Sequence, residues 1–342
     1  MKMAKDVTIY DIAQKLKVSP ATVSRALNDN PLVSKFTRKK VQNAAVKMGF
    51  RMNTFASNLR TQKTRTIGVI MHELRSNFMT SVLSGIEKVT NKAGYDLIIA
   101  HSAESYQKEV SNVHNLYQRR VDGLIASLAF DTPDLDHYLP YRKKEIPVIF
   151  YDRVDEQADF PKVIINNFQA GFEATKHLID EGCTRIVLVT ASLQRNVYAQ
   201  RHNGYLTALS QAQIPYKKNY VMVKDLYEQS AIDAANAVLK MKPLPDGAFI
   251  THDFSAAVFM QALKREGIRI PEDIAIVGFN NDAICTLMEP QLSTINYSGH
   301  KIGEAAANHL VNHLEGIASL SGTDTVIIKS ELVVRGSSLR KK

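Results

Sequence analysis

Apolar residues follow two different patterns along the chain, and the change falls near residue 66. After this point, short β-branched runs alternate with helical stretches of ten or more residues, which is typical of a parallel sheet built from βαβ units. The strands that this pattern predicts are 66–71, 95–100, 123–128, 147–152, 162–166, 185–190, 220–223, 247–252, 274–280 and 293–296.

Ten strands are too many for one open sheet of this length, so we expect two doubly wound lobes with a cleft between them. Ligands of such sheets bind beyond the carboxyl ends of the strands. The strand tips expected to face the cleft follow Met71, Asp152, Thr190, His252 and Phe279. The segment 325–338 has alternating character and is expected to add edge strands.

Residues 7–50 instead show short helical patterns. Thr8 followed by Asp11 is an N-cap signature, and Ser19 before Pro20 is another, close behind the first helix. A third helix is expected from Ser34 to Gly49. Helices of two turns are marginal alone and must pack on one another. The pattern predicts a helix-turn-helix unit, with a small bundle for protein contacts as the alternative.

Charge separates the same two parts of the chain. The net charge is +9, with +11 in residues 1–65 and −2 in the remainder. No acidic residue occurs from Asn30 to Arg65, whereas an ordinary solvated surface mixes both signs. A basic end of this kind indicates a nucleic acid as the partner.

Composition excludes several other classes of protein. Apolar residues make up 45% and charged residues 23%, and no run is long enough to span a membrane or resembles a secretory signal. Cys183 and Cys285 lack metal-ligand spacing, which fits a reducing cytoplasm. We find no glycine-rich phosphate loop, and we predict no catalytic residue, cofactor or metal.

The stretch "VTIYDIAQKLKVSPATVSRALN" resembles the signature of the LacI/GalR family of bacterial ligand-responsive transcription repressors. The resemblance continues through "TRKKVQNAAVKMGF", "YQRRVDGLIAS", "VIFYDR", "GIRIPEDIAIVGFNND" and "PQLSTI", in the order of the family. It implies an all-α helix-turn-helix head at 7–52, a hinge helix and linker at 53–65, and an α/β two-lobe sensor like periplasmic binding proteins at 66–342. The lobes are expected at about 66–165 plus 297–325 and about 166–296 plus 326–339.

The resemblance also implies the residues that contact DNA. Arg25 can make a bidentate contact to guanine, whereas Pro20 and Ala21 offer only apolar contact; a phosphate contact or a solvated charge is the alternative for Arg25. Leu59 matches the leucine that wedges into the minor groove. Those implied to contact phosphate are Thr8, Ser19, Thr22, Ser24, Asn28, Asn53 and Arg60. The sequence departs from the family at two positions: Met52 replaces the usual proline, which leaves the start of the hinge helix less sharply defined, and Arg60 replaces a small residue, where it can add a phosphate or minor-groove contact.

For the sensor, the resemblance implies effector-binding roles for Phe78, Met79, Asp152, Arg201, His252 and Asn280. Arg201 matches a ligand-clamping arginine, suited to paired hydroxyls or a carboxylate, with a surface helix charge as the alternative. Asp253 fits a helix N-cap better than a ligand contact. Asn280 stands where many relatives have Asp, so an anionic ligand is a further hypothesis if no carboxylate lies near Arg201.

The sequence therefore predicts a homodimeric, cytoplasmic, nucleoid-associated repressor that binds a pseudo-palindromic operator under the control of a small sugar or sugar derivative. Two alternatives belong to other classes. An enzyme would need a constellation of catalytic groups, but His72, His101 and His252 are scattered along the chain. An architectural protein that bends DNA without a signal would leave the sensor unused.

Overall fold

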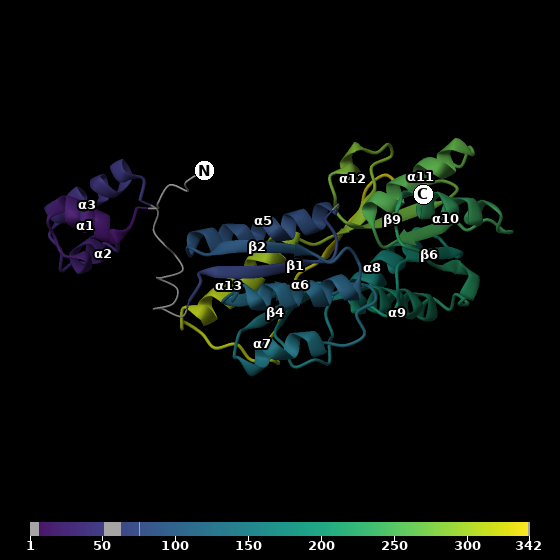
Figure 1. The fold of residues 1–342 in the computed structure, drawn as a ribbon. Helices are drawn as coiled ribbons and strands as arrows, with labels where there is room; N and C mark the ends of the chain where they lie inside the picture. Colours follow the sequence, from purple (N-terminus) through teal and green to yellow (C-terminus); the bar gives the residue numbers. More distant parts are fainter. Residues whose placement is uncertain (1–6, 51–62, 75, 341–342) are drawn as a thin grey trace, which may run out of the picture. The chain divides into compact units, whose positions relative to one another are not determined.

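The computed structural model describes residues 7–50, 63–74 and 76–340. Two compact units divide the chain, Met1–Thr64 and Arg65–Lys342, which we call the head and the sensor (Figure 1). The predicted order, a helical N-terminal part and then an α/β part, is confirmed. Of the hinge helix and linker predicted at 53–65, only residues 63–65 lie within the described part of the chain.

The head has three helices, α1 (Ile9–Leu16), α2 (Pro20–Leu27) and α3 (Lys35–Met48). Helix α1 begins at a capping box, in which the Thr8 amide donates to the Asp11 carboxylate at 2.7 Å. Helix α3 ends at Gly49, whose φ of 69° is a left-handed conformation that glycine adopts at little cost.

One small apolar core joins the three helices. It consists of Ile12, Ala13, Val23, Ala26, Val33, Val41, Ala44 and Ala45. Leu27 and Met48, which the sequence pattern placed inward, are half-buried at its edge. Because such short helices are marginal on their own, this shared core is what holds them in their folded form.

The sensor contains two six-stranded sheets, with strand orders β11-β5-β4-β3-β1-β2 and β12-β10-β9-β8-β6-β7. Neighbouring strands among the described residues run parallel, except that β12 is antiparallel to β10. The strands are β1 (Thr66–Met71), β2 (Asp96–His101), β3 (Gly123–Ala126), β4 (Val148–Tyr151), β5 (Lys162–Ile165), β6 (Ile186–Thr190), β7 (Val221–Val223), β8 (Gly247–Ile250), β9 (Ala275–Asn280), β10 (Ser293–Asn296), β11 (Thr325–Ile328) and β12 (Glu331–Val333).

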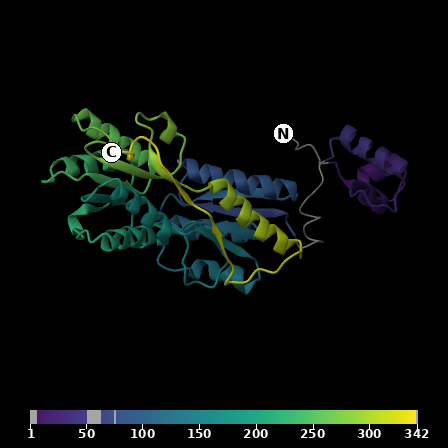
Figure 2. The ribbon, with the colours of Figure 1, turned by 180° about the vertical axis from the view of Figure 1, so that it is seen from behind.

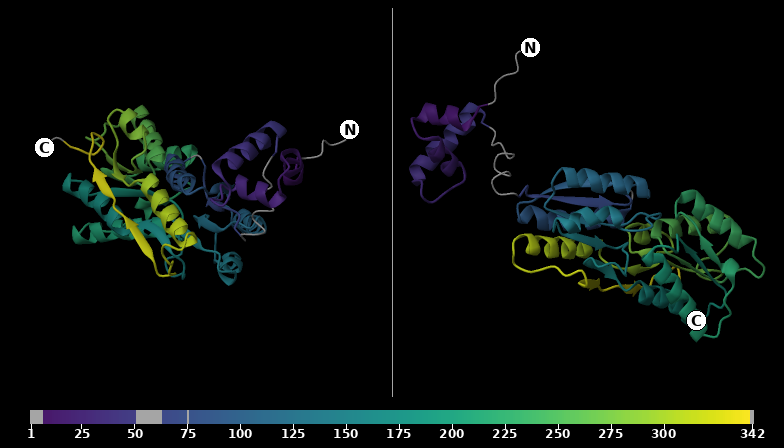
Figure 3. Two further views of the ribbon diagram at one scale, coloured as in Figure 1. Left: turned by 90° about the vertical axis from the view of Figure 1, so that its left-hand side faces the viewer. Right: turned by 60° about the horizontal axis from the view of Figure 1, so that its bottom comes forward.

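Helices cover both sheets, so the expected pair of doubly wound lobes is confirmed (Figure 3). They are α5 (Asn77–Lys92), α6 (Tyr106–Gln118), α7 (Leu139–Lys143), α8 (Asn167–Asp180), α9 (Asn196–Gln211), α10 (Glu228–Leu239), α11 (Asp253–Arg265), α12 (Ile284–Leu287) and α13 (Gly299–Leu314). None of the helices in the described part of the chain is both long and apolar enough to cross a bilayer.

The chain passes between the two sheets three times, after β5, after β10 and after β11 (Figure 2). The sequence interpretation set the last passage between residues 325 and 326. Strand β11 instead lies wholly in the first sheet, where Ile328 pairs with Ile165, so the chain crosses at residues 329–330. Alternation indicates that a strand lies at an edge, but it carries no information on which sheet provides the neighbouring strand.

Glycines allow the helices beside these crossings to touch. A Cβ at Gly303 of α13 would lie 2.0 Å from the Val82 carbonyl oxygen of α5. A Cβ at Gly171 of α8 would lie 2.3 Å from the carbonyl oxygen of Arg201 on α9. Only glycine permits backbones to approach this closely. The second contact matters for function, because it fixes the part of α9 that carries Arg201.

Candidate DNA-binding head and ligand cleft

Helix α2 of the head has the geometry of a helix that presents its N-terminus to a ligand. The Ser19 hydroxyl accepts a hydrogen bond from the Thr22 amide at 3.1 Å, and the two hydroxyl oxygens lie 2.8 Å apart. Pro20 occupies the first helical position. Because Pro20 has no N–H, and the Thr22 and Val23 amides both donate to Ser19, the Ala21 amide is the one in residues 20–23 left to meet an anion such as a phosphate.

The outer face of α2 carries the predicted base-reading side chains. Ala21 and Arg25 are exposed, whereas Val23 and Ala26 on the opposite face are buried in the core. Within the described residues, the Arg25 guanidinium has no hydrogen-bond or ion-pair partner. It is therefore available for a ligand outside the chain, as both base reading and phosphate contact require.

Other predicted phosphate contacts have local roles in the fold. The Thr8 hydroxyl donates to the Asp11 carboxylate at 2.7 Å, and the Asn28 amide donates to the Ser24 carbonyl at 2.8 Å. Both side chains remain exposed, and Ser24 is half-buried. Their contacts with phosphate stay predictions. Asn53, Leu59 and Arg60 lie outside the described residues.

The surface of the head is strongly basic. Residues 7–50 contain eight Lys and Arg against two acidic residues. Both acidic residues are engaged, Asp11 in the cap of α1 and Asp29 with Gln42 at 3.0 Å and Arg38 at 3.9 Å. The remaining positive charge is unopposed within the described head, which favours a polyanionic partner.

In the sensor, a cavity of about 470 Å³ lies where the strands of both sheets end. Five of the six predicted effector residues line it, namely Phe78, Asp152, Arg201, His252 and Asn280. Met79 does not. It lies fully buried in the apolar core, because its position on α5 shares the inward face of Val82 and Ile86. Phe78, one residue earlier, points to the cavity instead.

Arg201 is buried, which excludes the alternative that it is a surface charge. Its Nε donates to Asn167 Oδ1 at 2.9 Å and its Nη1 to the Thr251 carbonyl at 3.3 Å. The guanidinium stacks over the Phe279 ring, 3.5 Å from the ring centroid. These contacts hold the guanidinium at the wall of the cavity that Arg201 lines.

Asp152 lies at the tip of β4 with a φ of 57°. Burial raises the pKa of Asp152, while the nearby charges of Arg153 and Arg201 lower that pKa. A carboxylate therefore does lie near Arg201, and the condition for the anionic-ligand hypothesis is not met. Among the described residues, the cavity lining carries six carboxyl groups, Glu73, Glu104, Asp152, Asp225, Glu228 and Asp282, against the guanidinium groups of Arg153 and Arg201.

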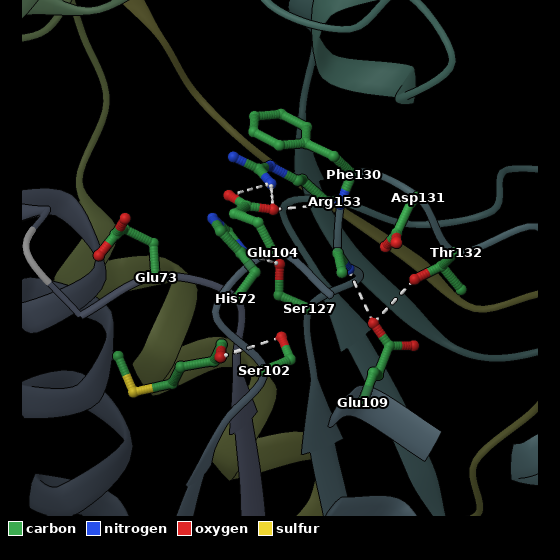
Figure 4. A network of polar contacts seen from close by, with 12 residues as sticks. His72, Glu73, Ser102, Glu104, Glu109, Ser127, Phe130, Asp131, Thr132 and Arg153 are labelled. Carbon is green, nitrogen blue, oxygen red and sulfur yellow. Dashed lines mark hydrogen bonds and ion pairs between the residues drawn. The ribbon is translucent and has the colours of Figure 1, made fainter. Parts of the chain in front are cut away.

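Arg153 forms a second anchored cation beside the cavity (Figure 4). Its Nη1 donates to both oxygens of Glu104, at 2.7 and 2.8 Å, and its guanidinium lies 4.1 Å from the centroid of the Phe130 ring. Its Nη2 donates to the Tyr198 hydroxyl of the other lobe at 3.2 Å. Arg153 thus joins an aromatic side chain from each lobe.

The loop after β3 that carries Phe130 is held by two carboxylates, the half-buried Glu104 and the buried Glu109 (Figure 4). Glu104 accepts from the Phe130 amide at 3.1 Å, and Glu109 accepts from the Ala129 amide at 2.7 Å and the Thr132 hydroxyl at 2.9 Å. Two backbone amides and one hydroxyl of the loop are thus bound to carboxylates outside it, which fixes the loop conformation. Phe130 is consequently preorganised at the cavity.

The two histidines of the lining are neutral at physiological pH. Burial lowers the pKa of His252 to about 4, and the charges of Arg201 and Arg153 lower it as well. Burial likewise holds the pKa of His72 well below its usual value, and its Nδ1 pairs with the Ser127 hydroxyl at 2.8 Å. Both rings act as polar, uncharged surface.

Sequence reasoning missed several residues of the cavity wall. Arg153 directly follows Asp152, a predicted strand-tip residue, in the stretch "VIFYDR". The sequence therefore did contain a signal that Arg153 lies near the cleft. Tyr198, Phe130 and Tyr297 come from loops and from the start of a helix, where no periodic signal marks a side chain as facing a cleft. These positions depend on how the two lobes meet.

The two parts of the chain match two family models. Residues 8–53 match "Bacterial regulatory proteins, lacI family", and residues 64–334 match "Periplasmic binding proteins and sugar binding domain of LacI family". The chain belongs to the LacI family. The predicted family resemblance is thereby confirmed.

Individual LacI-family relatives align over nearly the full length. Catabolite control protein A of Priestia megaterium is 31% identical over 310 residues, covering 90% of this chain and 93% of that protein. The HTH-type transcriptional repressor PurR of Vibrio atlanticus (strain LGP32) is 30% identical over 308 residues, covering 90% and 92%. A crystal structure of the Lac repressor dimer bound to operator and the anti-inducer ONPF shares the fold, with a TM-score of 0.87 at 24% identity over 98% and 100% of the two chains.

Proposed function

We propose that this protein is a transcriptional repressor that binds a pseudo-palindromic operator as a homodimer and responds to a carbohydrate-like effector in the sensor cleft. The observation that carries the proposal is the outer face of α2, where Arg25 stands exposed and without an internal partner on a capped helix of a basic head. Such a helix fits the major groove. The site of action is bacterial DNA in the cytoplasm.

The relatives support the same function. Both PurR and catabolite control protein A carry regulatory names, and the Lac repressor structure is a dimer on its operator. Among proteins of the same fold, one is a regulator in complex with cellobiose and another has bound ribose. These ligands are uncharged sugars.

The chemistry of the cleft suits an uncharged, polyhydroxylated ligand. Aromatic faces from Phe78, Phe130 and Tyr198 provide apolar contact, while the carboxyl groups and Arg201 pair with hydroxyls. An anionic ligand would face six carboxyl groups. We therefore favour neutral sugars over sugar acids or phosphosugars.

A second copy of the chain has a suitable surface along β2. This strand forms an edge of the first sheet, Ile99 on it is 47% exposed, and it borders a groove shared with α6. A partner subunit would cover this apolar edge.

Control of DNA binding requires the ligand to prefer one arrangement of the lobes. The hydrogen bonds that join the lobes include those from the Tyr227 hydroxyl to Glu73 at 2.9 Å and from Arg195 Nη2 to the Thr132 carbonyl at 2.6 Å. A ligand between the lobes changes the cost of making or breaking these bonds. Ligand binding thereby shifts the arrangement of the lobes and, with it, the placement of the two heads of the dimer.

Selection of binding sites from random duplex DNA by the full chain tests the proposal. We expect enrichment of one pseudo-palindrome, bound by two copies, with an affinity that changes when a neutral sugar is added. Binding to all sequences alike would indicate an architectural protein instead. Turnover of an added sugar would indicate an enzyme.

A further inference from the structure

The turn after β9 brings an additional carboxyl group to the cleft wall. Asn280 and Asn281 have φ angles of 122° and 56°; asparagine adopts the second more readily than most residues, whereas the first is a conformation that residues other than glycine adopt only when their surroundings enforce it. The turn directs the chain back so that Asp282 lines the cavity, with an exposed fraction of 9%. The strained backbone therefore serves to place this side chain.

The Asn280 side chain is oriented by its neighbours. Its Oδ1 accepts a hydrogen bond from the Tyr297 hydroxyl at 3.1 Å, so the amide nitrogen points the other way, where it donates to the Asp282 carboxyl group. The Tyr297 ring is itself packed between Phe78, at 4.8 Å, and Phe279, at 5.4 Å between ring centroids. With both ends engaged, the Asn280 amide has little freedom to read a ligand.

Asp253 fixes the backbone of Asp282 through a hydrogen bond. The fully buried carboxylate of Asp253 accepts from the Asp282 amide at 2.8 Å and from the Thr294 hydroxyl at 2.7 Å. The Asp253 carboxylate thus stabilises the turn after β9 and does not serve as a ligand contact. A carboxyl group of Asp282 that loses its proton faces this negative charge in a buried environment.

The ionisable groups around Asp282 are Asp253 on α11, Cys285 on α12 and Arg335 after β12, which donates to Asn281 Oδ1 at 2.8 Å. Burial raises the pKa of Asp282 to about 7, the charge of Asp253 raises it too, and the hydrogen bond from Asn280 lowers it. At neutral pH the group is present in both protonation states. It can then both donate to and accept from a hydroxyl.

Within the described residues, the Asn280 amide is the single hydrogen-bond donor to the Asp282 carboxyl group. A carboxyl group offers about four acceptor sites, so Asp282, which lines the cavity, keeps acceptor capacity for the hydroxyl of a ligand. By contrast, Arg153 and Arg201 donate hydrogen bonds to groups of the protein itself. Arg153 donates to Glu104, and Arg201 donates to Asn167 and Thr251.

We propose that Asp282 is the specificity-determining residue of the cleft, contacting the hydroxyl groups of an uncharged ligand, and that Asn280 is the positioning residue that aims it. The inference rests on the proposed function, since it concerns the same ligand site.

Carbon-13 NMR of the aspartate carboxyl groups in the full chain tests the arrangement without a ligand. We expect one resonance that titrates near neutral pH and is missing from Asp282→Asn. Asn280→Gly, which tolerates the positive φ and removes the amide, should move this titration to higher pH. Persistence of the near-neutral titration in Asp282→Asn, or its absence from the parent protein, would overturn the assignment.

Calorimetry with D-ribose and cellobiose as neutral probes, and with ribose 5-phosphate and gluconate as anionic ones, tests the ligand class. We expect a neutral probe to bind the parent chain and to bind Asp282→Asn about tenfold more weakly, as for loss of a hydrogen bond to a charged or partly charged group. Asp233→Asn, an exposed aspartate on α10, is the matched control and should bind as the parent does. Unchanged binding by Asp282→Asn, binding of anionic probes alone, or binding of no probe would contradict the inference.

Operator selection distinguishes a failure of the inference about Asp282 from a failure of the proposed function. If the parent chain selects an operator but Asp282→Asn keeps normal ligand binding, the inference about Asp282 fails and the proposed function stands. If the parent chain selects no operator, the proposed function fails.

Discussion

Arg25 is the polar side chain at the proposed base-reading positions of the head, since Pro20 and Ala21 provide only apolar surface. We expect Arg25→Ala to relax the preference at one base pair per half-site by about 1–3 kcal/mol, the usual worth of a bidentate arginine–guanine contact. Binding measurements against operators substituted at each position check this. Lys47→Ala removes a charge from the far end of α3 and should weaken binding to all operator sequences equally. The same uniform loss of affinity for Arg25→Ala would mean that Arg25 contacts phosphate.

Asp282 makes stability depend on pH. Burial and the charge of Asp253 raise its folded-state pKa to about 7, well above the unfolded value of about 4. The stabilisation associated with the protonated form is complete below pH 4 and is lost as pH rises through 7. Between low and high pH, the contribution of Asp282 to the free energy of unfolding changes by about 2–4 kcal/mol. We expect the melting temperature of Asp282→Asn relative to the parent to rise between pH 5 and pH 8. A difference that is constant with pH would contradict the shifted pKa.

At the scale of elements, close helix contacts depend on residues without a side chain. Gly303 lets α13 rest on the Val82 carbonyl of α5, and a Cβ there would lie 2.0 Å from that oxygen. We expect Gly303→Ala to destabilise the sensor by about 1–3 kcal/mol, because the overpacking cost exceeds the gain in helix propensity. Denaturant unfolding measures the change. Asn308→Ala, on the exposed side of the same helix, should leave stability nearly unchanged; equal effects would rule out the clash.

At the scale of the whole molecule, the head and the sensor have separate cores. The head buries only a handful of apolar side chains, and domains of its size are marginally stable. We expect two transitions in calorimetry, of which the head gives the lower. Deletion of residues 1–64 should remove that transition and leave the sensor transition in place. A single transition that moves as a whole on deletion would show that the units unfold together.

The sequence by itself determined the parts of this protein that depend on local chemistry. The caps at Thr8, Ser19 and Ser34 fix where the head helices begin, because side-chain oxygens satisfy the first backbone amides within three residues. The positions of the sensor strands followed from β-branched runs, and the split in charge indicated a polyanionic partner. The family signature added Phe78, Asp152, Arg201, His252 and Asn280, all of which line the cavity.

Only the tertiary structure decided how distant segments meet. It placed Met79 in the core although Phe78 beside it faces the cleft, since neighbouring helical residues point about 100° apart. It assigned β11 to the first sheet and joined Arg153 to Glu104, Phe130 and Tyr198 from four separate segments. The lowered pKa of His252 depends on burial and on the charges of Arg201 and Arg153, which belong to different lobes. A local pattern along one segment contains no record of such contacts.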